Sequence, residues 1–231
     1  MPKRAKPPDS FPSVYREALA YHEAGHAVMA CLLKLPIMRI VIGPNCNDQE
    51  DPNLDGKVYL DLSQIVEVPG YITALLAVAS EPAEKLAPSY AQFATLHKVH
   101  QHLKPFRNGL RNDLIQGYKC VAMVYQRQGF AESTALQHFK RTYRDLAGVM
   151  IPVKAKAVHA IAGCLQDRLE LDGQEAAELV KHTGPLEEEE GARRLRAALS
   201  DLLSEHPSPF SAARSFHRPL ALPDRTPGCW K

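Results

Sequence analysis

The chain has 231 residues, a formal net charge of +2 at pH 7, and 45% apolar residues. This length suits one main domain with tails, and the apolar share is sufficient for a hydrophobic core. The nearly neutral charge argues against electrostatic capture of nucleic acid, and no apolar run approaches the roughly 18 residues that a membrane span needs.

From Ser13, apolar and small residues recur at helical spacing as far as Leu32, and Pro36 follows, so we predict a helix there. Residues 37–42 form a short apolar run that is typical of a strand. Residues 57–62 alternate between apolar and polar side chains, which predicts a second strand. Two short strands joined by a long loop indicate a small sheet edge beside a helical body.

The remainder of the sequence reads as helical. Pro105 is expected to stop one helix, Asn112–Asp113 to open the next, and Asp172–Gly173 to form a turn. The predicted helices cover residues 69–86, 91–103, 112–128, 132–146, 153–168 and 174–181. The fold class is therefore mainly α (α+β), with a domain over 13–183, an N-terminal tail over 1–12 and a partly disordered C-terminal extension over 184–231.

The five cysteines are odd in number, and no two are spaced as Cys-x-x-Cys. We therefore expect reduced thiols rather than a disulfide framework, which fits the cytoplasm or a similar reducing compartment such as an organelle stroma. The first twelve residues are rich in proline and contain no apolar stretch, so we expect no signal peptide.

The chemistry-bearing motif is His22-Glu23-Ala24-Gly25-His26. Two histidines four residues apart project from the same face of a helix, and both imidazoles can reach one zinc ion. Glu23 is then placed beside the metal, as the general base for a zinc-bound water that attacks a carbonyl. Gly25 in a helix interior costs about 1 kcal/mol relative to alanine, which predicts a close approach of another segment at that turn.

A catalytic zinc needs a third protein ligand and one open coordination position. Asp113 at a predicted helix start is one candidate, although such an aspartate commonly serves as a cap. Glu81 and Glu84 lie at i and i+3 on a predicted helix, where glutamates commonly form a solvated face. Three histidines close in sequence are the remaining candidates: His97, His100 and His102.

The segment Tyr21–Val28 resembles the zinc helix of the FtsH family of ATP-dependent metalloproteases. Three later segments agree with that family in the same order. Leu76–Leu86, with Ala83–Glu84, resembles the helix that ends in the family's Ala-Ala-Glu-Glu, and Asn112–Leu114 resembles its Asn-Asp-Leu segment. Leu171–Glu175 resembles the Leu-Asp-Gly-Glu-Glu near the end of the family's protease domain. The resemblance covers about residues 14–183.

The resemblance implies that Asp113 is the third zinc ligand beside His22 and His26, with Glu23 as the base. It also implies a mainly helical fold with a small sheet whose edge strand holds an extended peptide. The strands at 37–42 and 57–62 are the candidates for that edge.

The sequence also departs from the family. No Gly-x-x-x-x-Gly-Lys-Ser/Thr phosphate loop occurs in the 231 residues, so we expect no ATP-driven unfolding by the chain itself. Residues 104–111 replace the family's approach to the third ligand, which concerns substrate handling rather than the ligand.

The leading hypothesis is thus a zinc metalloendopeptidase that acts on unfolded or flexible polypeptides. Two alternatives are a non-proteolytic, zinc-stabilised binding module and a protease subunit that works with a separate AAA-type ATPase. The family forms hexamers, and the sequence allows a homo-oligomer without specifying one.

Overall fold

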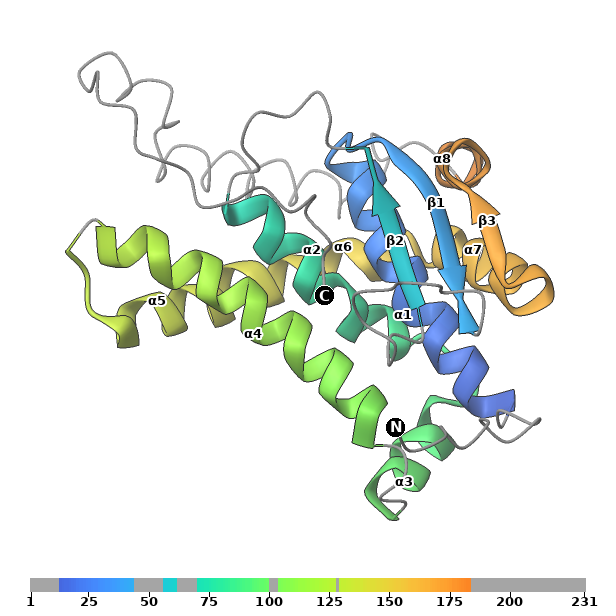
Figure 1. The fold of residues 1–231 in the computed structure, drawn as a ribbon, viewed down its shortest axis with the longest axis horizontal. Coiled ribbons are helices and arrows are strands. Elements are labelled where there is room, and N and C mark those ends of the chain that lie inside the picture. The colour runs from blue at the N-terminus through green and yellow to red at the C-terminus, as the bar shows by residue number, and fades with distance from the viewer. Residues whose placement is uncertain (1–12, 44–55, 62–69, 100–103, 128, 184–231) are drawn as a thin grey trace, which may run out of the picture.

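The structure is a computed structural model that describes residues 13–43, 56–61, 70–99, 104–127 and 129–183 (Figure 1). The expected tail over 1–12 and the extension over 184–231 lie outside these residues. The elements are α1 (Ser13–Leu32), β1 (Ile37–Ile42), β2 (Gly56–Leu60), α2 (Gly70–Glu84), α3 (Tyr90–Val99), α4 (Lys104–Arg127), α5 (Glu132–His138), the π-helix η3 (Phe139–Arg144), α6 (Asp145–Val153), α7 (Ala155–Arg168), β3 (Glu170–Asp172) and α8 (Gly173–His182). The predicted fold class, mainly helical with a small sheet, is confirmed.

Helix α1 runs through the centre of the molecule, with α2 and α7 against it and the sheet laid across it (Figure 1). Val28 and Met29 are fully buried. A Cβ atom on Gly25 would lie 2.6 Å from the Cβ of Ala83 and 2.7 Å from the carbonyl oxygen of Ala79. The close approach that the glycine predicted is therefore the contact between α1 and α2.

The sheet is antiparallel, in the order β2-β1-β3. The predicted strand at 37–42 is confirmed as β1, but it is the central strand, so its proposed role as an edge strand is wrong. The second predicted strand is β2, which is an edge and begins one residue earlier, at Gly56.

The short strand β3 was not predicted, because its three residues include a single buried side chain, Leu171, and offer too little pattern. The expected turn at 172–173 is instead the end of this strand and the start of α8. The carboxylate of Asp172 caps that helix by accepting from the backbone N–H of Gln174 at 2.8 Å.

Helix α4 begins at Lys104, so the prediction that it opens at Asn112–Asp113 is wrong. Pro105 does not act as a stop either, because it lies in the first turn, where backbone N–H groups have no intrahelical acceptor. Asp113 consequently lies well inside the helix. Farther along, Gly117 allows α4 to pack closely on α2, since a Cβ there would be 2.8 Å from that of Ala77.

Helices α5, η3 and α6 follow one another without an interruption from Glu132 to Val153. The predicted helix over 132–146 therefore continues for seven more residues, and the break falls at Lys154. The π-helical turn in the middle places Phe139 and Tyr143 in the core. No single helix of the described residues has the length and apolarity to cross a membrane; one bent pair, 132–153 with 155–168, meets that test only together, across an angle of 78°.

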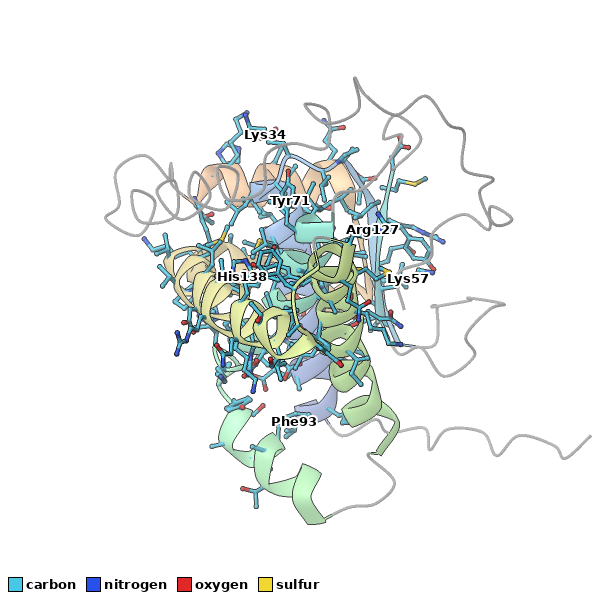
Figure 2. All side chains as sticks on the ribbon, turned by 90° about the vertical axis from the view of Figure 1, so that its left-hand side faces the viewer. Lys34, Lys57, Tyr71, Phe93, Arg127 and His138 are labelled. Carbon is cyan, nitrogen blue, oxygen red and sulfur yellow. The ribbon has the colours of Figure 1, made fainter. Side chains whose placement is uncertain are left out.

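Helix α3 packs against the N-terminal end of α1, which lies at the bottom of the view in Figure 2. The rings of Phe93 and Tyr15 lie 6.0 Å apart, centroid to centroid. The hydroxyl and the backbone N–H of Ser89, which precedes α3, both donate to the carboxylate of Glu17. The described cysteines, Cys31, Cys120 and Cys164, are all free.

Candidate metal centre

Three of the predicted ligands meet at one point between α1 and α4. The Nε2 atoms of His22 and His26 lie 3.0 Å apart. The Oδ2 atom of Asp113 lies 3.0 Å from Nε2 of His22 and 3.4 Å from Nε2 of His26. Asp113 follows His22 by 91 residues and His26 by 87 residues in the sequence. Together the three side chains can hold a metal ion.

The spacing of these three atoms fits the coordination of a small divalent ion. Tetrahedral bonds of about 2.0–2.1 Å place two ligand atoms about 3.3 Å from one another. The observed separations are 3.0, 3.0 and 3.4 Å. The cluster therefore matches one shared ion with little movement of the side chains.

The hydrogen-bond partners of the two imidazoles determine which ring nitrogen faces the cluster. Nδ1 of His26 lies 2.8 Å from the carbonyl oxygen of Leu76, which can only accept, so Nδ1 carries the proton. Nδ1 of His22 lies 2.7 Å from the carboxylate of Glu84, so this Nδ1 also carries the proton and donates it to the carboxylate. In the neutral form of each ring, Nε2 then carries a lone pair directed at the cluster, and a cation shared with the Asp113 oxygen would satisfy all three acceptors.

Electrostatics at the cluster show the same need for positive charge. Burial alone would lower the pKa of His22, but its hydrogen bonds to Asp113 and Glu84 raise that pKa well above its usual value. Burial would raise the pKa of Asp113, but hydrogen bonds from His22 and His26 hold it well below its usual range. A proton and a metal ion therefore compete for His22.

Glu23 lies beside this cluster and does not belong to it. Its side chain is 6% exposed, and its Oε1 atom lies 3.9 Å from Nε2 of His22. Burial raises the pKa of Glu23, while His22 and His26 act in the opposite direction. A raised pKa brings the carboxylate closer to the range in which it can both take up and release a proton near neutral pH.

The other ligand candidates have different roles. Glu84 is turned to the far nitrogen of His22, so it orients a ligand. Glu81 makes a bidentate contact with Arg144 on η3, away from the cluster. The side chain of His97, and His100 and His102 entirely, lie outside the described residues.

Sequence reasoning missed two parts of this site. The carbonyl of Leu76 fixes the tautomer of His26, and Gly56 lies against Glu23. No residue-type signal could identify a backbone carbonyl. A glycine at the start of a strand does indicate that another segment approaches closely, but the sequence does not show that this segment is Glu23.

Comparison with models of known protein families finds no match, and comparison with curated proteins finds none either. The resemblance to the FtsH family therefore stays a prediction that rests on the motif residues of the sequence. What the geometry adds is independent of that family: two histidines, one aspartate and a buried glutamate in one place.

Proposed function

We propose that the chain is a zinc metalloendopeptidase that hydrolyses peptide bonds in unfolded or flexible polypeptides. One observation carries the proposal: a buried carboxylate, that of Glu23, lies 3.9 Å from a His-His-Asp cluster without being part of it. A purely structural metal site needs no such group, because its ligands already complete the coordination.

Zinc is the metal that this ligand set favours. Two imidazoles and one carboxylate, with a fourth position open, are typical of catalytic zinc sites. His22, His26 and Asp113 would hold the ion, with Glu84 and the Leu76 carbonyl keeping both rings in orientation. When bound, zinc supplies Lewis-acid chemistry: it polarises a carbonyl and lowers the pKa of water.

Glu23 acts first as the general base and then as the general acid in this mechanism. Its Oε1 atom accepts a proton from the attacking water and then delivers that proton to the leaving amine nitrogen. Burial keeps competing solvent away from the carboxylate between the two steps. Hydrolysis consumes one water and leaves a new carboxyl and a new amino terminus.

The open edge of β2 supports an extended polypeptide as the substrate. Ile42 on β1 donates its N–H to Leu169, on the β3 side, at 2.8 Å. Ile42 is paired with Gly56, so the main-chain groups of Gly56 and, two residues on, Val58 point away from β1. No described strand pairs with that edge. Strand addition there would bind a peptide largely through its main chain.

Cleavage of an unfolded protein such as casein tests the proposal. The zinc-loaded wild type should cleave casein, and chelation should stop the cleavage. Glu23→Gln should retain zinc, because Glu23 is not a ligand, and should lose at least 100-fold in kcat.

Equal cleavage by Glu23→Gln and wild type would overturn the role given to Glu23. Zinc binding without any cleavage by the wild type would favour the binding module. Cleavage that appears only on addition of an ATPase captured with the chain in the presence of ATP would favour a subunit that works in trans.

A further inference from the structure

The first residue of β2 lies directly against the side chain of Glu23. A Cβ atom built on Gly56 would be 2.6 Å from Oε1, 2.8 Å from Cγ and 2.9 Å from Cδ of Glu23. All three separations are below 3.0 Å, which real Cβ atoms essentially never show. Because the overlap extends along the side chain, rotation of the carboxylate alone would not relieve it.

Glu23 has little room to move away from a larger residue at position 56. Its side chain is almost fully buried in the core around α1. Its Oε1 atom is 3.9 Å from Nε2 of His22, so a shift in that direction brings the carboxylate into the histidine cluster. A side chain at position 56 would therefore change the position of the carboxylate relative to the cluster.

The contact is also unlike the surroundings of four glycines in helices. A Cβ on Gly163 in α7 or on Gly148 in α6 would meet no atom within 4 Å. Gly25 and Gly117 are packed, but on the alanines of α2. Among these glycines, Gly56 is the one whose missing side chain makes room for an ionisable group.

We propose that Gly56 is a positioning residue for Glu23: its missing Cβ lets the edge strand close against the carboxylate and holds Oε1 beside the histidine cluster. The proposal rests on the peptidase function proposed above. The main-chain groups of Gly56 also face the open edge of β2. A peptide strand that pairs with this edge would therefore lie beside the residue that contacts Glu23. Gly56 thus links the place of substrate binding to the place of proton transfer.

Gly56→Ala tests this link in the zinc-loaded protein. The expected result is one zinc per chain, as in wild type, a KM for a casein peptide within about twofold, and a kcat lower by about 10- to 100-fold, since small misplacements of a reacting group have effects of that size. Gly163→Ala is the matched control, with kcat and KM unchanged. An unchanged kcat, or a rise in KM alone, would overturn the positioning role.

A double-mutant cycle tests the contact without relying on activity. Glu23→Ala removes Cγ, Cδ and Oε1, so it leaves space for a Cβ at position 56. Gly56→Ala should lower the melting temperature of the wild type by about 2–6 °C and should cost almost nothing in the Glu23→Ala background. Equal costs in both backgrounds would overturn the proposal. If the wild type cleaves nothing, the peptidase function fails, while this cycle still decides whether Gly56 positions Glu23.

Discussion

Two glutamates one turn apart on α2 have opposite surroundings. Glu84 faces α1, is 4% exposed and bonds to Nδ1 of His22 at 2.7 Å, and burial raises its pKa. Glu81 faces η3, where Arg144 contacts it at 2.8 and 2.6 Å and Lys85 at 3.2 Å. Burial opposes the effect of these cations on Glu81, but they nevertheless lower its pKa.

The difference shows what decides the role of a carboxylate on a helix. Residues at i and i+3 are separated by only about 60° around the helix axis. That rotation is enough to direct Glu84 to the face of α2 that packs on α1 and Glu81 to the face that packs on η3. Both were equal candidates for a metal ligand by sequence, and the partner helix distinguishes them.

Neutralising each glutamate in turn should give the largest contrast. Glu84→Gln weakens the hydrogen bond that orients His22, so zinc affinity should fall by about 10- to 100-fold. Glu81→Gln should change zinc affinity by less than twofold, because it contacts no ligand. Competition with a chromogenic chelator measures both. A larger loss for Glu81→Gln would contradict the division between the two faces.

Replacing a glycine by alanine should have opposite effects on stability at the α1–α2 contact and on the side of α2 that faces η3 and α6. Gly25→Ala would drive a Cβ into Ala83 and Ala79, and should lower the free energy of unfolding by about 1–3 kcal/mol. Gly148→Ala, on α6 near Glu81, meets open space and should stabilise by about 0.5–1 kcal/mol. Urea unfolding of the two variants checks the signs, and loss of stability in both would refute the packing difference.

The ion pair on the η3 face should give the smallest effect, and one that depends on pH. The pKa of Glu81 is lowered in the folded protein, so its contribution is present above the pKa of the unfolded chain and is lost as pH falls through the folded pKa. The pair is partly exposed, which limits it to about 0.5–1 kcal/mol. Wild type should therefore melt slightly above Glu81→Gln at pH 7, with the gap closing as pH falls below the usual range of a glutamate carboxyl. A gap that widens in acid would contradict this sign.

The local parts of the site could be predicted from the sequence. The spacing of His22 and His26 is a property of one helix, and the strand at 37–42 has the predicted bounds. The place of Asp113 could not follow from periodicity, because it depends on how α4 packs against α2 and thereby brings Asp113 to the histidines of α1. Only the resemblance to a family selected it among the candidates.

The starts of elements were harder to predict than their existence. Pro105 is as compatible with a first helical turn as with a stop. The predicted start of α4, Asn112, is therefore eight residues later than the observed start, Lys104. The edge position of β2 depended on an unpredicted third strand, whose pairing with β1 makes β1 central. The contact of Gly56 with Glu23 is a tertiary one and leaves no pattern along the chain.

The most direct test of the metal centre is the zinc content of the purified protein, measured with that of Asp113→Ala prepared in the same way. Asp113 is the one ligand that comes from outside α1, so its removal tests the assembled site rather than the motif. We predict one tightly held zinc per chain in the wild type and loss of stoichiometric zinc in Asp113→Ala. A wild type without zinc, or an Asp113→Ala variant that retains zinc as tightly as wild type, would contradict a His22-His26-Asp113 centre.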